Sequence, residues 1–371
     1  MGLGLLREET SDGSLTMDAR EERSDRSNVL RQEWPYLSVE GSAYELGYQH
    51  GAQASHLIDK YLLWIDRMTG KSRDELCQNA MAFLPLMERL SPQYVEEVRG
   101  LAEGAGISFE EAVLCQARGE AAKVGDEACT AFAMTGKATK DGATLAGQNQ
   151  DLAPDYADFA LLLHVKPTDG RPQALLFTFA GQLGYSGMNE HGVAHFANAL
   201  YDCPWKMGLP HYPIKRVCLE KQDVAGISEV LDTHHTCSAG NMVICSGDGE
   251  IADFEIRPEG AERYTGADPD CIIHANHYES EVYFDHETNS LADSCPRADR
   301  MRSLVTEHYG EVSVETMKAI LADHDGDPAA ICRHGAEEMI SVSGYIADAT
   351  NRVLHVRKGH GCTGTWTAYE V

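Results

Sequence analysis

Cys129, in the run Ala128-Cys129-Thr130-Ala131-Phe132, is the cysteine whose surroundings best suit nucleophilic chemistry. A polar segment, residues 123–127, precedes it and an alternating, strand-like run follows it. Cleavage of the Ala128–Cys129 peptide would make Cys129 a new N-terminus, which carries a thiol and an α-amine that acts as its base. Such an amine has an ordinary pKa of about 7.7–8.0 and accepts a proton near neutral pH. The sequence therefore predicts self-cleavage that creates an N-terminal cysteine nucleophile.

Three polar residues are the expected partners of this thiol, although a cysteine at the start of a strand is more often a small core residue. Thr130 can donate a hydrogen bond locally. Asn149 and Asp151 end the next strand-like run, and antiparallel pairing is expected to bring them beside Cys129. Asp151 would then orient the α-amine or bind substrate; the alternative is a solvated carboxylate in a turn. We expect Thr130 and Asn149 to bind substrate.

Asn276 follows an apolar strand in His274-Ala275-Asn276-His277. An amide at the end of a strand is a fixed donor, suited to an oxyanion that forms during acyl transfer. The alternative is an Asx turn. The spacing Cys271-x-x-His274-x-x-His277 also suggests zinc, but along a strand Cys271 and His274 point to opposite faces. We therefore predict no metal site.

Composition limits the classes of partner. The 371 residues are 43% hydrophobic and 24% charged, which is typical of a soluble globular protein. A net charge of -27 repels nucleic acid and anionic membranes, and no apolar run approaches the roughly 18–20 residues of a membrane helix. Eleven cysteines without regular spacing indicate neither a disulfide framework nor a zinc ribbon, so a reducing cytoplasm is expected.

The pattern of apolar residues changes at Cys129 from a period of about 3.6 to a period of 2. Residues 1–33 are predicted to be a disordered tail. Residues 34–128 are predicted to be mostly helical, and residues 129–371 to form stacked sheets covered by helices, an α+β fold. The expected helices are 42–64, 73–87, 93–103, 109–117, 213–222, 226–235, 298–308 and 314–323. The expected strands are 36–41, 129–134, 144–150, 159–165, 173–179, 185–189, 193–199, 241–246, 250–257, 271–275, 341–347, 352–356 and 365–369.

Three runs together resemble the acyl-CoA:6-aminopenicillanic acid acyltransferase family, the C45 group of autoproteolytic N-terminal-nucleophile enzymes. The runs are Cys129-Thr130-Ala131-Phe132, Gly147-Gln148-Asn149-Gln150-Asp151 and His274-Ala275-Asn276-His277. The resemblance begins at Gly41-Ser42-x-x-Glu45-Leu46-Gly47-x-x-His50-Gly51 and reaches the final strands, so only the tail lies outside it.

The resemblance implies a four-layer αββα sandwich and a cut before Cys129. Residues 34–128, the helical pro-segment, would become a small chain that stays bound to the large chain, residues 129–371, as a heterodimer. It also implies that Cys129 both cleaves the chain and accepts the acyl group, with Asp151 serving the site and Asn276 donating to the oxyanion. The expected substrate is a small N-acyl amine or amide; no cofactor is expected, although acyl-CoA is possible as an acyl donor.

Two departures from the family pattern bear on cleavage. Ala128 stands where the acyltransferase that gives the family its name has glycine, and Arg257 replaces a serine implicated in processing. A third bears on the substrate, because the Ser-Arg pair that holds an anionic substrate in that enzyme has no clear match. Glu337 and Glu338 fall nearest to its place and, with the acidic surface, favour a cationic or neutral amine.

Two alternatives remain open at this point. The chain could stay uncut and pair Cys129 with a histidine, as papain-like proteases do, or it could be a degenerate binding protein that kept the fold. The sequence does not identify the acyl group, the amine or the acceptor, nor the efficiency of the cut.

Overall fold

The computed structural model describes residues 33–122, 128–201, 203–288, 290–334 and 339–371. Nearly all of the predicted tail lies outside the described residues, as do Glu337 and Glu338. Within the described part of the chain, no helix is both long and apolar enough to cross a membrane.

The larger of two β-sheets has eight strands in the order β1-β4-β5-β6-β7-β8-β9-β10. Its neighbouring strands are antiparallel, apart from the parallel pair β1 and β4. These strands are β1 (Tyr36–Gly41), β4 (Ala160–Pro167), β5 (Ala174–Phe179), β6 (Ser186–Asn189), β7 (Ala194–Ala199), β8 (Gly240–Cys245), β9 (Ile251–Arg257) and β10 (Gly260–Tyr264). Because β1 precedes Cys129 in the chain, the N-terminal part contributes a strand to this sheet.

The smaller sheet has six antiparallel strands in the order β11-β2-β3-β12-β13-β14. They are β2 (Ala128–Met134), β3 (Leu145–Leu152), β11 (Cys271–His274), β12 (Ile340–Asp348), β13 (Val353–Lys358) and β14 (Thr365–Glu370). Cys129 therefore lies in β2, between the edge strand β11 and β3.

The helices fall into a front group and two covering pairs. The front group is α2 (Ala43–Thr69), α3 (Arg73–Met81), α4 (Leu84–Leu90), α5 (Pro92–Ala105), α6 (Phe109–Gln116) and α7 (Arg118–Ala122). The covering helices are α8 (His211–Cys218), α9 (Val224–Thr233), α10 (Ser294–Glu307) and α11 (Val314–Ile320). Two short 3₁₀ turns, η1 (Pro154–Asp158) and η2 (Phe284–His286), complete the described elements.

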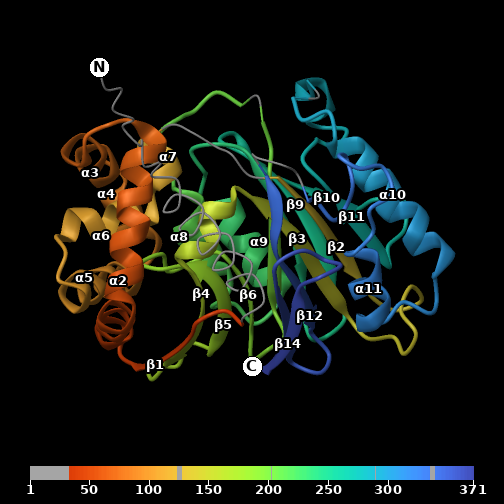
Figure 1. Ribbon diagram of the computed structural model, residues 1–371, viewed down its shortest axis with the longest axis horizontal. Coiled ribbons are helices and arrows are strands. Elements are labelled where there is room, and N and C mark those ends of the chain that lie inside the picture. The colour runs from red at the N-terminus through yellow and green to blue at the C-terminus, as the bar shows by residue number, and fades with distance from the viewer. Residues whose placement is uncertain (1–32, 123–127, 202, 289, 335–338) are drawn as a thin grey trace, which may run out of the picture.

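The two sheets stack face to face between the covering helices, so the predicted αββα order is confirmed. In β2, Ala131 and Ala133 pack in the core between the sheets, while Phe132 and Met134 pack against α10 and α11. A second outer core joins α8 and α9 to β7, β8 and β9. Figure 1 shows α10 and α11 at the right, beyond β2 and β3, and the front helices at the left, beside β4.

One predicted helix, 73–87, is two helices in the structure, α3 and α4. The chain turns at Ala82, whose N–H donates to the carbonyl of Asn79. Pro85 lies in the first turn of α4, where its missing N–H costs nothing, whereas inside a longer helix it would remove a backbone bond. Strand β10 was not expected from the sequence.

The motif between Gly41 and Gly51 lies mostly on α2, and two of its residues make structural contacts. Gly47 of α2 lies so close to α5 that a Cβ there would be 1.8 Å from the carbonyl oxygen of Glu97. The Glu97 side chain forms an ion pair with Arg216 of α8 at 3.0 Å, with both side chains at most 2% exposed. His50 accepts a bond from the N–H of Gly181 at 3.1 Å, and burial, followed by Arg216, lowers the pKa of His50 to about 3. These contacts join the front helices to the larger sheet.

We expect Gly47→Ala to lower the free energy of unfolding by at least about 1–3 kcal/mol, because the added methyl group overlaps the backbone of α5. Urea denaturation followed by circular dichroism measures the change. Gln53→Ala, at an exposed position of the same helix, should stay within about 0.5 kcal/mol of the wild type. Equal stability of Gly47→Ala and wild type would show that α2 and α5 can move apart without a cost in free energy.

Candidate active site

The thiol of Cys129 is completely buried on the face of β2 that points toward the larger sheet. Gln150 is its cross-strand partner on β3 and donates from Nε2 to the sulfur at 3.1 Å. Gln148, also on the inner face, donates to the same sulfur at 3.5 Å. An amide can hold a sulfur atom but cannot remove its proton, so neither glutamine supplies a general base.

Asp151, Asn149 and Thr130 lie on the other face of the sheet, which corrects the expectation that their side chains lie beside the thiol. The register pairs Ala128 with Asp151 and Thr130 with Asn149, and directly paired residues share one face. Since side chains alternate along a strand, these three point toward α10 and α11 instead of toward the thiol of Cys129.

Each of these three side chains is committed to a structural bond. Asn149 donates from Nδ2 to the carbonyl oxygens of Leu321 and Ile331, at 2.9 and 2.8 Å. Thr130 accepts from Arg297 at 2.6 Å. Asp151 accepts from the Ser341 hydroxyl at 2.6 Å, and burial raises the pKa of this carboxyl although Arg297 opposes the shift. The geometry therefore gives no support to Thr130 and Asn149 as substrate-binding residues.

Asn276 lies against Cys129. Its Oδ1 accepts from the backbone N–H of Cys129 at 3.0 Å, and its Nδ2 donates to the carbonyl of Ala199 on β7 at 2.9 Å. The Asx-turn alternative fails, because both side-chain atoms bond to distant parts of the chain. The side chain therefore bridges the two sheets beside the peptide bond that is predicted to break.

Arg297, on α10, is the main residue of the site that the sequence analysis missed. Its guanidinium is fully buried and donates to the carbonyl of Cys129 at 2.6 Å and to Oδ1 of Asn276 at 2.8 Å. Asp293, one turn earlier on the helix, accepts from it at 3.1 Å. One rigid cation thus fixes both the residue predicted to become the nucleophile and its amide partner. An arginine within a helical pattern gives no sign of this in the sequence.

The strand that presents Asn276 is anchored by His274. Its Nε2 lies 3.0 Å from Oε1 of Glu255 on β9, and its Nδ1 contacts the carbonyl of Ala275 at 2.8 Å. Burial opposes the charged imidazole, but Asp253 and Glu255 raise the pKa of His274 to about 9. His274 is therefore an imidazolium near neutral pH and ties the smaller sheet to the larger one.

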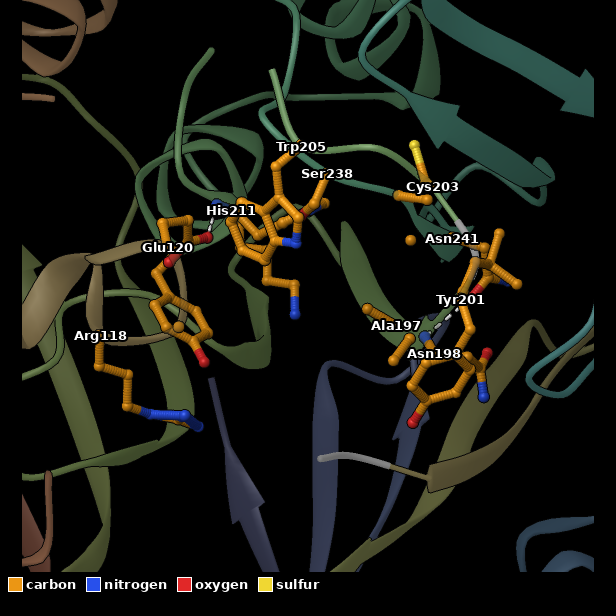
Figure 2. A pocket seen from close by; sticks show the side chains of 17 residues that line it. Arg118, Glu120, Ala197, Asn198, Tyr201, Cys203, Trp205, His211, Ser238 and Asn241 are labelled. Carbon is orange, nitrogen blue, oxygen red and sulfur yellow. Dashed lines mark hydrogen bonds between the residues drawn. The ribbon is translucent and has the colours of Figure 1, made fainter. Parts of the chain in front are cut away.

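A cavity of about 210 Å³ opens beside the bridge that Asn276 makes, since Ala199 belongs to its wall. Figure 2 shows Asn198 and Tyr201 on one side and Arg118, Glu120 and His211 on the other. The wall also includes Lys215 of α8 and Trp205. The cavity is smaller than the roughly 300–1,000 Å³ of sites for drug-sized ligands, so it suits a small chemical group.

Positive charge prevails in this wall. Arg118 lies over the rings of Tyr156 and Tyr212, at 5.2 and 5.5 Å, and Lys215 lies 5.0 Å from the ring of Tyr185. Burial raises the pKa of Glu120. Burial, followed by Lys215, lowers the pKa of His211 to about 3, so this imidazole is neutral. The wall thus has two cationic side chains and one carboxyl.

A family model for acyl-coenzyme A:6-aminopenicillanic acid acyl-transferase matches residues 138–349, more than half of the chain. The chain belongs to this family. The match includes the positions of Asp151 and Asn276 and begins after Cys129. A curated member, the 40 kDa form of this acyltransferase from Emericella nidulans, is 28% identical over 337 residues, which are 87% of this chain and 92% of that protein.

Two solved structures are also similar to the chain. Conjugated bile acid hydrolase from Clostridium perfringens, solved as a variant, has a TM-score of 0.41 and 10% identity over 66% of this chain and 97% of its own. Penicillin V acylase from Agrobacterium tumefaciens has a TM-score of 0.40 and 11% identity over 66% of this chain and 86% of its own. Membership of the acyl-transferase family, not these two likenesses, makes the chain an acyltransferase or amide hydrolase.

We expect Arg297→Met to slow cleavage of the 128–129 peptide bond by on the order of 10²-fold, because Cys129 and Asn276 would lose the cation that aligns them. The measurement is the fraction of cut chain against time after synthesis, read on denaturing gels. Arg263→Met removes an exposed arginine that is paired with Glu250 on the surface and should not change the rate. Normal cleavage in Arg297→Met would remove this residue from the site.

Proposed function

We propose that the chain is an autoproteolytic enzyme with an N-terminal cysteine nucleophile that hydrolyses or transfers a small acyl group held in amide linkage. One observation carries this proposal: the backbone of Cys129 is held on both sides, because its N–H donates to Asn276 and its carbonyl accepts from Arg297. Membership of the acyl-transferase family supports the same chemistry.

Maturation would begin with attack of the Cys129 sulfur on the carbonyl carbon of Ala128. The C–N bond breaks, the acyl group of Ala128 moves to sulfur as a thioester, and the nitrogen gains a proton to become the α-amine. Water then hydrolyses the thioester and frees the thiol and the carboxyl end of Ala128. Alanine here gives the backbone less freedom than glycine, so a slower cut is expected than with glycine.

Turnover would use the thiol of Cys129 as the nucleophile and the α-amine of Cys129 as the base. The α-amine takes the thiol proton while the sulfur attacks the substrate's amide carbonyl, and the leaving amine takes that proton as the C–N bond breaks. Water or a second amine then attacks the thioester. Asn276 is placed to orient the new amine through Oδ1, and Arg297 nearby disfavours its protonated form because like charges repel.

Asn276 can serve the oxyanion only if its Nδ2 leaves the carbonyl of Ala199 or shares the bond with substrate. We propose that substrate entering beside Ala199 does this. Asp151 pairs with Ala128 at the start of β2. We propose that its carboxyl serves the site at this end of the strand and does not contact the thiol.

The cavity wall suggests which substrates fit. Lys215 and Arg118 favour an N-acyl compound with a carboxylate, in contrast to the cationic or neutral amine that Glu337 and Glu338 suggested. Those two glutamates lie outside the described residues, so the preference rests on the cavity alone. The reducing cytoplasm stays our proposed location, because all eleven cysteines are free thiols.

Denaturing mass spectrometry should find two fragments, residues 1–128 and 129–371, in active wild type, and only uncut precursor in Cys129→Ala, because that variant lacks the attacking sulfur. Cys295→Ser, outside the site on α10, should be cut like the wild type. An intact chain in an active sample would favour the papain-like alternative instead. An uncut chain that binds amides without turnover would favour the degenerate binding protein.

We expect Lys215→Met to lower kcat/KM for carboxylate-bearing N-acyl substrates by about 10- to 100-fold relative to their neutral carboxamide analogues, the range of one charged hydrogen bond. Steady-state assays with paired substrates on cut enzyme measure it. Lys206→Met, at an exposed position next to the cavity wall, is the control. A wild-type preference for cationic substrates would contradict the cavity argument and return weight to the two glutamates.

A further inference from the structure

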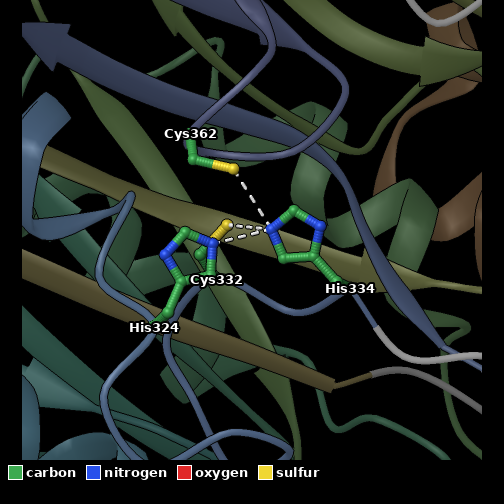
Figure 3. Close-up of side chains that lie close together, drawn as sticks. All are labelled: His324, Cys332, His334 and Cys362. Carbon is green, nitrogen blue, oxygen red and sulfur yellow. Dashed lines mark hydrogen bonds between the residues drawn. The ribbon is translucent and has the colours of Figure 1, made fainter.

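Four side chains outside the proposed active site bring their ligand atoms together: His324, Cys332, His334 and Cys362. Their imidazole nitrogens and sulfurs all lie within 4.8 Å of one another. Nε2 of His334 is the common neighbour, at 2.7 Å from Nε2 of His324, 3.5 Å from Sγ of Cys332 and 3.2 Å from Sγ of Cys362. Figure 3 shows the four groups pointing at one another from separate segments.

The fold fixes the segments that carry these groups. His324 follows α11, Cys332 and His334 precede β12, and Cys362 lies in the turn between β13 and β14. The backbone N–H of Cys332 donates to the carbonyl of Asp323 at 2.9 Å. A Cβ on Gly361 would lie 2.2 Å from the carbonyl oxygen of Leu321, so the β13–β14 turn lies directly against the segment after α11.

We propose that His324, Cys332, His334 and Cys362 bind one Zn²⁺ ion in a closed, structural site. Two thiolates and two imidazoles are a usual donor set for tetrahedral zinc. Bonds of about 2.3 Å to sulfur and 2.0–2.1 Å to nitrogen place neighbouring donor atoms roughly 3.3–3.8 Å apart. Both sulfur distances to His334 are near this range, whereas the nitrogens of His324 and His334, 2.7 Å apart, must separate further.

The main competing explanation is a disulfide between Cys332 and Cys362. It would use the two sulfurs and give no reason for two imidazole nitrogens to converge on the same point. Both cysteines are free thiols in the structure. The ring of His360 lies against that of His334, with centroids 4.2 Å apart and a tilt of 31°, and Nδ1 of His360 contacts the carbonyl of Arg333 at 3.0 Å. Such outer contacts orient a metal-binding imidazole.

The four donors fill a tetrahedral shell, which leaves no coordination position for substrate and makes the role structural. Arg333 lies between two of the proposed ligands and forms an ion pair with Asp293 at 2.6 Å. Asp293 in turn holds Arg297, the cation of the proposed active site. Zinc would therefore hold the segment around Arg333 in place, and this segment supports Arg297 through Asp293.

The test measures metal in full-length protein that has been incubated with zinc chloride under reducing conditions and then desalted. Inductively coupled plasma mass spectrometry should find about one zinc ion per chain in the wild type. Cys362→Ser and His334→Asn should bind zinc at least about 100-fold more weakly and lose it on desalting. Cys295→Ser, outside the cluster, should keep it. A chelator should lower the Tm of the wild type and leave that of Cys362→Ser unchanged.

Wild type loaded with Co²⁺ gives a second readout that needs no variant, because thiolate-bound tetrahedral cobalt absorbs visible light strongly. Wild type without stoichiometric zinc, or Cys362→Ser with wild-type affinity, would overturn the proposal. So would a Cys332–Cys362 disulfide that peptide mapping finds in protein kept under reducing conditions. Cleavage before Cys129 is scored separately, so failure of the zinc site leaves the proposed enzyme function standing.

Discussion

The buried guanidinium of Arg297 is the interaction on which the site depends. Arginine cannot give up its proton in a protein, so a completely buried one must find acceptors for its N–H groups. Arg297 finds them in the carbonyl of Cys129, the hydroxyl of Thr130, Oδ1 of Asn276 and the carboxylate of Asp293. Strand β2, the end of β11 and helix α10 are therefore fixed relative to one another by one charge.

The smaller sheet places different polar contacts on its two faces. On the inner face, the thiol of Cys129 contacts the amides of Gln148 and Gln150. On the outer face, Asn149 donates to the carbonyls of Leu321 and Ile331, which belong to the segment between α11 and β12. The proposed zinc ligands lie in and beside that segment. Strand β3 therefore supports both the proposed zinc site and the proposed active site.

The front helices, which precede Cys129 in the chain, are packed tightly against one another and against the rest of the fold. Gly47 lets α2 approach α5, and Glu97 forms a buried ion pair with Arg216. The segment before Cys129 also pairs β1 with β4 and buries apolar side chains in the main core, so a cut before Cys129 would leave these helices bound. The cavity needs them as well, because Arg118 and Glu120 of α7 form part of its wall.

The sequence by itself determined the layered α+β fold, because strand and helix periodicities are local signals, and it predicted Cys129 and Asn276 as partners that the structure joins by a hydrogen bond. It could not determine which face Asp151 and Asn149 occupy, since that depends on the register in which β2 pairs with β3. Nor could it find Arg297, or the cluster of His324, Cys332, His334 and Cys362, whose members are brought together from separate segments. Only tertiary structure decides such convergence, because burial makes distant charges and donors satisfy one another.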